Sequence, residues 1–287
     1  MTGRRGVTAT DKVMFAFLAA DTAVVLWHAP VIASWPWLLL GNALAVALIL
    51  LLQRAPVTPL LRFLGGGYGV ILTVAYYTQL GVIALDVGTV HDALVQRWEA
   101  LLFGSELSVT WHARMPSLTL SWILHFCYGA YYWIVAVAAY GLFFRAPRGA
   151  FERGMFLLTL GFYACYVIFS LFPVAGPRYF FGDATGPIAS VLPARIVHRL
   201  LQGGSAYGTA FPSSHVTASW CAVLALWRDA RPVALVLAPV ALGLAFGTVY
   251  GQFHYGVDAI AGAVLALVLY RVSEPLRLAL GPAVPPS

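Results

Sequence analysis

The chain has 287 residues, of which 61% are hydrophobic and only 10% are charged. Soluble domains carry roughly 25% charged residues, so a water-soluble fold of this length is excluded and one membrane domain is expected. The formal net charge of +6 comes from 17 basic residues that are spread singly along the chain, without a Lys/Arg-rich block. The composition therefore gives no indication of a nucleic-acid partner.

Eight apolar segments, each near the length that crosses a bilayer, follow one another along the chain. They are residues 12–32, 37–53, 68–86, 117–144, 155–173, 212–228, 232–250 and 254–272. This pattern predicts an all-α, polytopic transmembrane helical bundle of about eight helices. Residues 1–277 are interpreted as a single integral membrane domain, and the tail 278–287 is expected to be disordered. Asp21, inside the first segment, is expected to face the bundle interior.

The distribution of basic residues predicts the orientation of the bundle. If the N-terminus is cytoplasmic and the segments alternate, five of the 17 basic residues lie in outer loops and the other twelve lie inside. An excess of Lys and Arg on the cytoplasmic side favours this topology, which puts both termini in the cytoplasm. Two long loops, 87–116 and 174–211, then lie on the periplasmic, extracellular or lumenal face. Each contains a stretch typical of a short amphipathic helix, 92–104 and 193–204.

Three short motifs are predicted to meet at this outer face. They are GlyProArg at 176–178, PheProSerSerHis at 211–215 and HisTyrGlyValAsp at 254–258. His254 and Asp258 are four residues apart and share a helix face, so the carboxylate is placed to orient the imidazole as in a nucleophilic triad. His215, on another helix, is placed to protonate a leaving oxygen. The motifs therefore indicate acid–base and nucleophilic chemistry.

The same motifs supply groups suited to phosphate. Ser213 and Ser214 lie at the start of a helix, where backbone N–H groups and hydroxyls form an anion site. Arg178 offers a planar donor fork that matches phosphate oxygens. We therefore expect a phosphoester active site without a metal or cofactor. The alternatives are solvated interface residues and a zinc-like His/His/Asp site, which would leave Arg178 and the serines unexplained.

These motifs resemble those of the type 2 phosphatidic acid phosphatase superfamily, which has Lys-x6-Arg-Pro, Pro-Ser-Gly-His and Ser-Arg-x5-His-x3-Asp. The resemblance covers residues 155–272 and implies a six-helix lipid phosphatase-like core with extra N-terminal helices. It implies that His254 attacks phosphorus to form a phosphohistidine, that Asp258 orients His254, and that His215 protonates the leaving alcohol. The arginine and the serines of the first two motifs would hold the phosphate oxygens.

Several positions depart from the family pattern. They are Leu171 for the lysine, Tyr179 for the proline, Ser214 for the glycine, and Gly247 and Thr248 for the Ser-Arg pair. Two phosphate-binding cations are therefore missing. Such departures, with the stretches GluAlaLeuLeuPheGly (99–104) and CysTyrGlyAlaTyrTyr (127–132), are similar to the inositol phosphorylceramide synthase and sphingomyelin synthase branch, a phosphotransferase group.

Other basic residues and histidines lie outside the three motifs. Arg195 or Arg199, four residues apart in the second outer loop, could replace the missing cations, or could only anchor that helix to lipid headgroups. His198, between them, is given no role. His112 and His125 are isolated and are interpreted as structural.

The acceptor of the second step decides the function. Water would make the protein a lipid phosphate phosphatase, acting for example on phosphatidic acid or a polyprenyl pyrophosphate, whereas a lipid or polyol hydroxyl would make it a phosphotransferase. The departures favour transfer, with membrane lipids as substrate and acceptor; the oligomeric state is left open. Two reference pKa values near ~6.5 predict a bell-shaped pH profile. Rival interpretations are a transporter and a serine protease using Ser214 or Ser205.

Overall fold

The computed structural model describes residues 5–56 and 58–281, which fold into helices joined by loops. The helices are α1 (Ala9–Trp27), α2 (Trp35–Arg54), α3 (Pro59–Ile71), α4 (Thr73–Val87), α5 (Asp92–Phe103), α6 (Leu107–Arg114), α7 (Leu118–Gly129), α8 (Tyr131–Arg145), α9 (Arg148–Leu171), α10 (Pro177–Phe181), α11 (Pro187–Ser190), α12 (Leu192–Gly204), α13 (Ser214–Asp229), α14 (Arg231–Tyr250) and α15 (Gly256–Leu280). Within the described ranges no β-strand forms, so the all-α prediction is confirmed.

Five helical segments are long and apolar enough to cross a membrane, and the number rises to six if α7 and α8, bent by 44°, are counted as one span. They coincide with six of the eight apolar segments. The other two segments coincide with α1, which carries three charged residues, and with α13, which has only 16 residues. The prediction of a polytopic helical membrane protein is therefore confirmed.

Helix α13 lies at the centre of the bundle, where it packs against α8, α9, α14 and α15. Its central place explains why it is less apolar than its neighbours: small polar residues such as Thr217 and Ser219 are completely buried. The Thr217 hydroxyl lies 3.0 Å from the carbonyl oxygens of both Ser213 and Gly262, so it ties α13 to α15. A polar side chain that bonds to backbone carbonyls is stable away from water.

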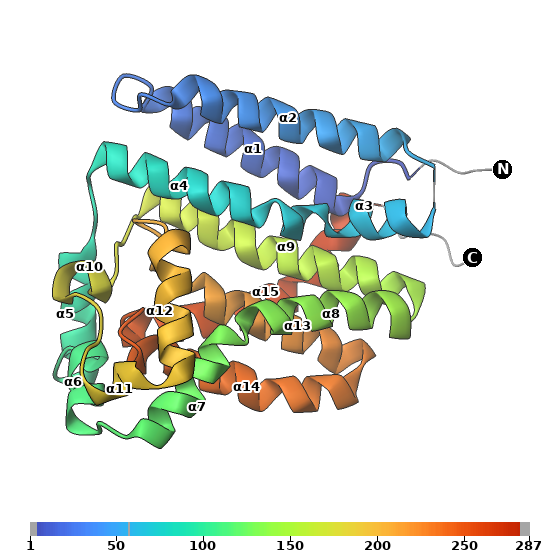
Figure 1. The fold of residues 1–287 in the computed structure, drawn as a ribbon. Helices are drawn as coiled ribbons and strands as arrows, with labels where there is room; N and C mark the ends of the chain where they lie inside the picture. The colour runs from blue at the N-terminus through green and yellow to red at the C-terminus, as the bar shows by residue number, and fades with distance from the viewer. Residues whose placement is uncertain (1–4, 57, 282–287) are drawn as a thin grey trace.

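The N-terminal helices cover one side of this core (Figure 1). Helix α1 packs against α2 and α9, and α3 packs closely against α9. Gly69 permits this approach, because a Cβ atom there would lie 2.6 Å from the Thr159 hydroxyl. Asp21 faces the interior, as expected: its Oδ2 accepts from the side-chain amides of Asn42 (2.8 Å) and Gln79.

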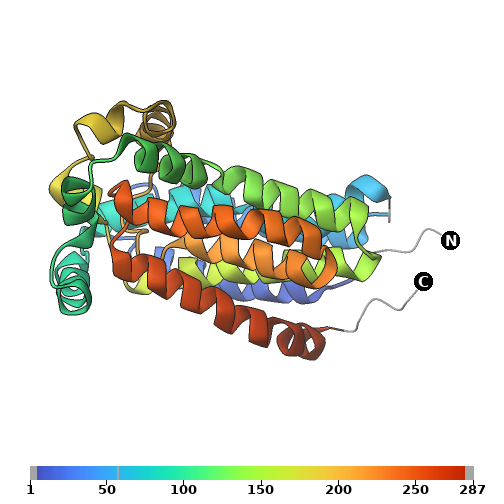
Figure 2. The ribbon, with the colours of Figure 1, turned by 90° about the horizontal axis from the view of Figure 1, so that it is seen from below.

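The short helices gather at one end of the bundle. Figure 1 shows α5, α6, α10 and α11 at that end, with α12 running across the direction of the long helices. Figure 2 shows α14 and α15 extending from the same end to the opposite one, where α15 ends. Helices α5 and α12 coincide with the two predicted amphipathic stretches. Helix α15 continues to Leu280, and residues 282–287 of the predicted tail lie outside the described residues.

Candidate active site

Backbone contacts bring the three motifs together at this end of the bundle. The N–H of Val174 donates to the carbonyl of Gly208 (3.2 Å), and the N–H of Ala210 donates to the carbonyl of Val174 (2.8 Å). This short parallel bridge holds the GlyProArg segment beside the PheProSerSerHis segment. The N–H of Ser213 donates to the carbonyl of Asp258 (3.0 Å), which joins the second motif to the third. The predicted convergence of the motifs is therefore confirmed.

One pocket is lined by one charged or titratable residue from each of the three motifs, whereas Asp258 lies behind His254 and outside the lining. Arg178, His215 and His254 line it, together with hydroxyl groups from Tyr77 and Thr209. The ring centroids of the two histidines are 5.9 Å apart. The open space is only about 20 Å³, which holds little more than one water molecule, so a phosphate group requires the lining side chains to move apart.

The environment of His254 orients its imidazole ring and keeps the ring neutral. Its Nδ1 lies 3.4 Å from Oδ2 of Asp258, which also accepts the backbone N–H of Tyr255 at 2.9 Å. Burial lowers the pKa of His254 to about 4, and a hydrogen bond with the backbone of Ala210 opposes this shift. The imidazole is therefore neutral at neutral pH, which is the form in which a ring nitrogen has a free lone pair.

His215 projects from the first turn of α13 into an aromatic setting. Tyr128 stacks on it with ring centroids 5.3 Å apart, and the Tyr131 ring lies at 4.4 Å. These tyrosines flank Ala130, where α7 gives way to α8. Within the described chain, Nδ1 of His215 has no hydrogen-bond partner. The nitrogen is thus free to exchange a proton with a substrate.

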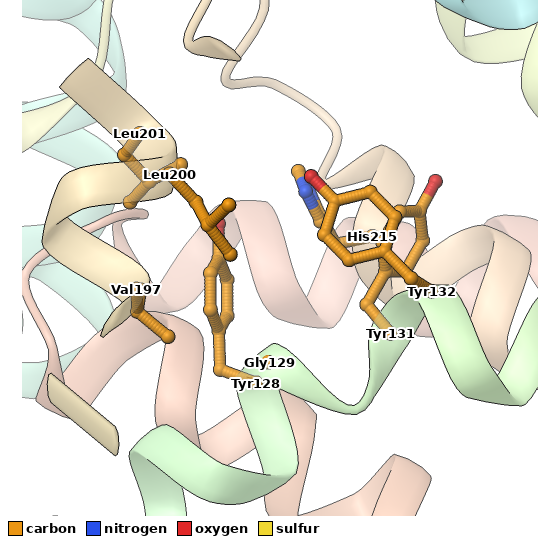
Figure 3. Close-up of a pocket in the computed structure, with 8 residues that line it drawn as sticks. All are labelled: Tyr128, Gly129, Tyr131, Tyr132, Val197, Leu200, Leu201 and His215. Carbon is orange, nitrogen blue, oxygen red and sulfur yellow. The ribbon is translucent and has the colours of Figure 1, made fainter. Parts of the chain in front are cut away.

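A second, apolar recess lies beside His215 (Figure 3). Its lining consists of Tyr128, Gly129, Tyr131, Tyr132, Val197, Leu200, Leu201 and His215. Figure 3 shows the α12 side chains facing the tyrosines across this recess, with His215 beside Tyr131 and Tyr132. Tyr132 is 58% exposed and Leu200 is 50% exposed, so the recess opens outward. The imidazole therefore borders a polar pocket and an apolar recess.

Arg178 already has a carboxylate partner that the sequence did not predict. Its Nε and Nη2 lie 3.1 and 3.0 Å from Oδ1 of Asp183, in the loop between α10 and α11. Nδ1 of His198 lies 3.9 Å from the same oxygen. Asp183 is partly exposed, so it can exchange its contact with Arg178 for water when an anion arrives. Arg178 thus lines the pocket while it is paired with a carboxylate that lies outside the lining.

Asp92, the first residue of α5, holds the loop that carries Arg178. Its two carboxylate oxygens accept the backbone N–H groups of Ala175 and Gly176, both at 2.8 Å. The hydroxyl of Tyr255 donates to it at 3.1 Å, which links this loop to the His254 motif. Asp92 is 1% exposed, and its three hydrogen bonds compensate for burial of the carboxylate.

Glu99, also on α5, holds the start of α15. Its two oxygens accept the backbone N–H groups of Gly256 (3.0 Å) and Val257 (2.9 Å), and the side chain is completely buried. These are free N–H groups at a helix N-terminus, where a carboxylate is favoured. Asp92 and Glu99 are seven residues apart and therefore share one helix face, a spacing that could have identified them.

The remaining predicted residues do not reach the pocket in this structure. Ser213 caps α13 by accepting from the N–H of Val216 (3.4 Å), and both Ser213 and Ser214 are buried outside the pocket lining. Arg195 and Arg199 are exposed on α12 and line neither recess. The two arginines are therefore not positioned to replace the missing cations.

The rival chemistries receive no geometric support in the described part of the chain. No group of three His, Cys, Asp or Glu side chains is arranged to hold a metal ion there. Ser205 lines the pocket, but its recorded contact is with the hydroxyl of Tyr179 at 3.4 Å. Neither Ser205 nor Ser214 pairs with a histidine among residues 5–56 and 58–281.

Comparison with known families gives one match: the family described as the PAP2 superfamily matches residues 93–272, more than half of the chain. The matched region begins in α5 and includes all three motifs, so it extends further towards the N-terminus than the 155–272 resemblance. No curated protein and no solved structure gives a significant match.

Proposed function

The chain belongs to the PAP2 superfamily, and on this premise we propose that it is a membrane-embedded phosphotransferase that moves a phospholipid headgroup through a phosphohistidine on His254. A lipid phosphatase-type enzyme is the function that the family supports in general. The observation that carries the proposal is that Arg178, His215 and His254 line one small pocket. That pocket brings together an anion-binding group, a candidate acid and a candidate nucleophile.

The charge of the pocket favours a phosphodiester over a phosphomonoester. Among the lining residues that the structure describes, Arg178 is the one permanent cation, and Asp183 partly neutralises it. The hydroxyl-bearing residues of the lining, such as Tyr77 and Thr209, add no positive charge. A phospholipid diester carries one negative charge on phosphorus, whereas a monoester carries up to two near neutral pH. A single, half-compensated arginine suits the diester.

The reaction proceeds in two balanced steps. In the first, a ring nitrogen of His254 forms a bond to phosphorus, the bond from phosphorus to the lipid alcohol breaks, and His215 gives its proton to the leaving oxygen. In the second, an acceptor hydroxyl gives its proton to His215 and attacks phosphorus, and the bond to His254 breaks. Asp258 stabilises the positive charge that develops on His254. Positioning and charge stabilisation supply most of the rate enhancement.

Water and a lipid hydroxyl can both act as the acceptor, so hydrolysis is the second candidate function. The apolar recess beside His215 supports the lipid acceptor, because leucine and tyrosine side chains line its open space of about 10 Å³ and would contact an alkyl chain once they move apart. The motif departures at Leu171 and Thr248 support the same preference. No metal ion takes part in the proposed steps.

We place the pocket on the non-cytoplasmic face. The basic residues support this orientation, because most of those at helix ends lie at the end of the bundle opposite to the histidines. Arg54 at the end of α2, Arg145 at the end of α8 and Arg228 near the end of α13 belong to this group. Cytoplasmic ends of membrane helices carry such an excess.

The decisive experiment supplies purified protein in mixed micelles with matched lipids. The two donors are the monoester phosphatidic acid and the diester phosphatidylinositol. The two acceptors are ceramide and diacylglycerol. Free phosphate, inositol phosphate and new phospholipid are measured together, with a chelator present. His254→Ala tests the nucleophile, and His28→Ala, which alters a histidine at the C-terminal end of α1 outside the pocket lining, is the matched control.

We expect a new phospholipid from the diester donor, little free phosphate, and loss of both signals in His254→Ala only. Free phosphate from phosphatidic acid, or inositol phosphate from phosphatidylinositol, that depends on His254 and forms without transfer would assign the protein as a hydrolase. Full activity of His254→Ala would exclude the phosphohistidine mechanism. Trapping of a phosphorylated protein that is labile to acid and stable to base would support the intermediate directly.

A further inference from the structure

A separate cavity of about 220 Å³ lies between α9, α13 and α15, at the end of the bundle opposite to the histidines. Its charged lining contains Arg153, Arg228, Asp229, Arg271 and Glu274. Arg271 lies fifteen residues beyond the start of α15, which is roughly 22 Å along the helix from the His254 motif. The cavity is therefore far from the active site and more than ten times larger than its pocket.

The acidic residues of the cavity are already paired. Asp229 accepts from Arg153 at 2.8 Å. Glu274 accepts from Arg277 through both oxygens, each at 2.9 Å. Arg228 and Arg271 form no ion pair within the described part of the chain. The cavity consequently retains uncompensated positive charge.

A third arginine of the cavity, Arg153, has an unpaired hydrogen-bond donor. The Nε of Arg153 is buried and has no hydrogen-bond partner among residues 5–56 and 58–281. Its Nη2 is held by Asp229, so the guanidinium is fixed in place. A buried donor without a partner is costly unless a ligand or water satisfies it. An anion with several oxygens would satisfy Arg153 and the two unpaired arginines together.

The surface next to the cavity fits a hydrocarbon chain. Val264, Leu267, Val268 and Arg271 are spaced at i, i+3, i+4 and i+7, so they share one face of α15. The three apolar side chains are 51–55% exposed, although they belong to a membrane-spanning helix. This apolar face leads along the helix to the arginine at the cavity. The positively charged cavity thus adjoins an exposed apolar face, which matches the charged headgroup and the apolar chain of an anionic phospholipid.

We propose that this cavity binds the phosphate-bearing headgroup of an anionic phospholipid whose acyl chain lies along the Val264–Val268 face of α15. The site is distinct from the catalytic pocket and does not depend on the reaction proposed for it. Basic pockets between membrane helices are suited to anionic headgroups, because each exposed arginine contributes to the attraction. The same phosphate chemistry is present in soluble phosphate, so the experiment must separate the two sources.

The test is a lipid titration of the purified full chain in neutral detergent, followed by native mass spectrometry and by the thermal midpoint from tryptophan fluorescence. The ligands are phosphatidylglycerol, phosphatidylcholine and glycerol 3-phosphate. The test variant is Arg228→Gln with Arg271→Gln, which keeps the Arg153–Asp229 pair. The matched control is Arg54→Gln with Arg145→Gln, which removes two exposed arginines that do not line the cavity.

We expect phosphatidylglycerol to bind and stabilise the wild type and the control pair, and to bind the test variant on the order of ten-fold more weakly. Arg178→Gln should retain the effect, which separates the cavity from the catalytic pocket. Equal weakening in both double variants would overturn the proposal in favour of general surface attraction. Equal stabilisation by glycerol 3-phosphate would overturn it in favour of a soluble anion.

Discussion

Two regions of this protein bury carboxylates, and they give them different partners. In the N-terminal helices, Asp21 accepts from the side-chain amides of Asn42 and Gln79. At the motif end, Asp92 and Glu99 accept from backbone N–H groups of the segments that carry the site. The first arrangement joins helices to one another, whereas the second fixes the course of two loops.

The difference matters because the two arrangements affect different properties. A bond between side chains on neighbouring helices contributes to the free energy of unfolding, but it does not define where a catalytic atom lies. A carboxylate that holds two consecutive backbone N–H groups fixes the path of the chain there, and a misplacement of about 1 Å can reduce a rate by about 10²-fold. We therefore expect substitutions on α5 to alter catalysis and those around Asp21 to alter stability.

The largest effect is expected for Glu99→Gln. The amide keeps the size of the side chain but replaces one acceptor oxygen with a donor, which opposes the N–H of Gly256 or Val257. The start of α15 shifts, and kcat for the proposed headgroup transfer should fall by about 10²-fold with the protein still folded. The measurement is steady-state kinetics with circular dichroism on the same sample; an unchanged kcat would show that α5 does not position His254.

Asp92→Asn should have the next largest effect. Its target is the Ala175–Gly176 loop, so Arg178 moves and phosphate binding weakens. We expect kcat/KM to fall about tenfold, mainly through KM, because a charge-assisted contact is worth about 1.5–3 kcal/mol. Glu99→Gln is the comparison, since that variant should lose activity mainly through a lower kcat. If kcat and KM changed in the same proportions in both variants, the two carboxylates would not have separate roles.

Asp183→Asn should change binding in the opposite direction. The amide weakens the ion pair that holds Nε and Nη2 of Arg178, so the guanidinium becomes more available to the substrate. Because Asp183 is partly exposed, the effect is modest, and KM should fall about threefold with kcat nearly unchanged. Initial rates over a range of donor concentrations measure this. A higher KM would mean that the pair supports binding.

Activity should change little in mild acid. Burial lowers the pKa of His254 to about 4, so the imidazole stays neutral as the pH falls from 7.5 to 5.5 and is protonated only near pH 4. Protonation of His254 should therefore lower kcat/KM by less than about twofold over that range, whereas an imidazole with an unshifted pKa of about 6.5 would cost about tenfold. The acid limb of the bell-shaped profile thus moves towards pH 4. A limb centred near 6.5 would show that His254 is solvated.

Asp21→Asn should have the smallest effect on catalysis. Both Asn42 and Gln79 donate to Oδ2 of Asp21, and the oxygen of the new amide can take that place. The new Nδ2 then stands where Oδ1 is buried without a partner in the described chain, so it becomes a buried donor without an acceptor. This costs about 1–3 kcal/mol of stability and should lower the thermal midpoint by several degrees. The kinetic constants should remain within about twofold of the wild type. A large loss of kcat would break the distinction between the two regions.

The sequence predicted the helices and the three motifs well, for a physical reason. Apolar segments must span the bilayer, and the motifs begin or end those segments, so their convergence follows from alternating topology. Asp92 and Glu99 were not predicted, because charged residues on a short loop helix usually face water. Their partners are backbone groups of distant segments, which leave no mark in the composition. Asp183 was missed for the same reason: only the fold brings its loop to Arg178.

The two carboxylates of α5 that hold backbone N–H groups, Asp92 and Glu99, here called the α5 tethers, also determine which positions evolution can vary. Every amino acid except proline offers a backbone N–H, so Asp92 and Glu99 can hold the segments at Ala175 and Val257 whatever side chains stand there. The tethers themselves allow no such freedom, because an acceptor with two oxygens is required. Among related sequences we therefore expect the two acids of α5 to be invariant, while the residues they hold drift. The catalytic loops can then acquire new substrate contacts without losing their position.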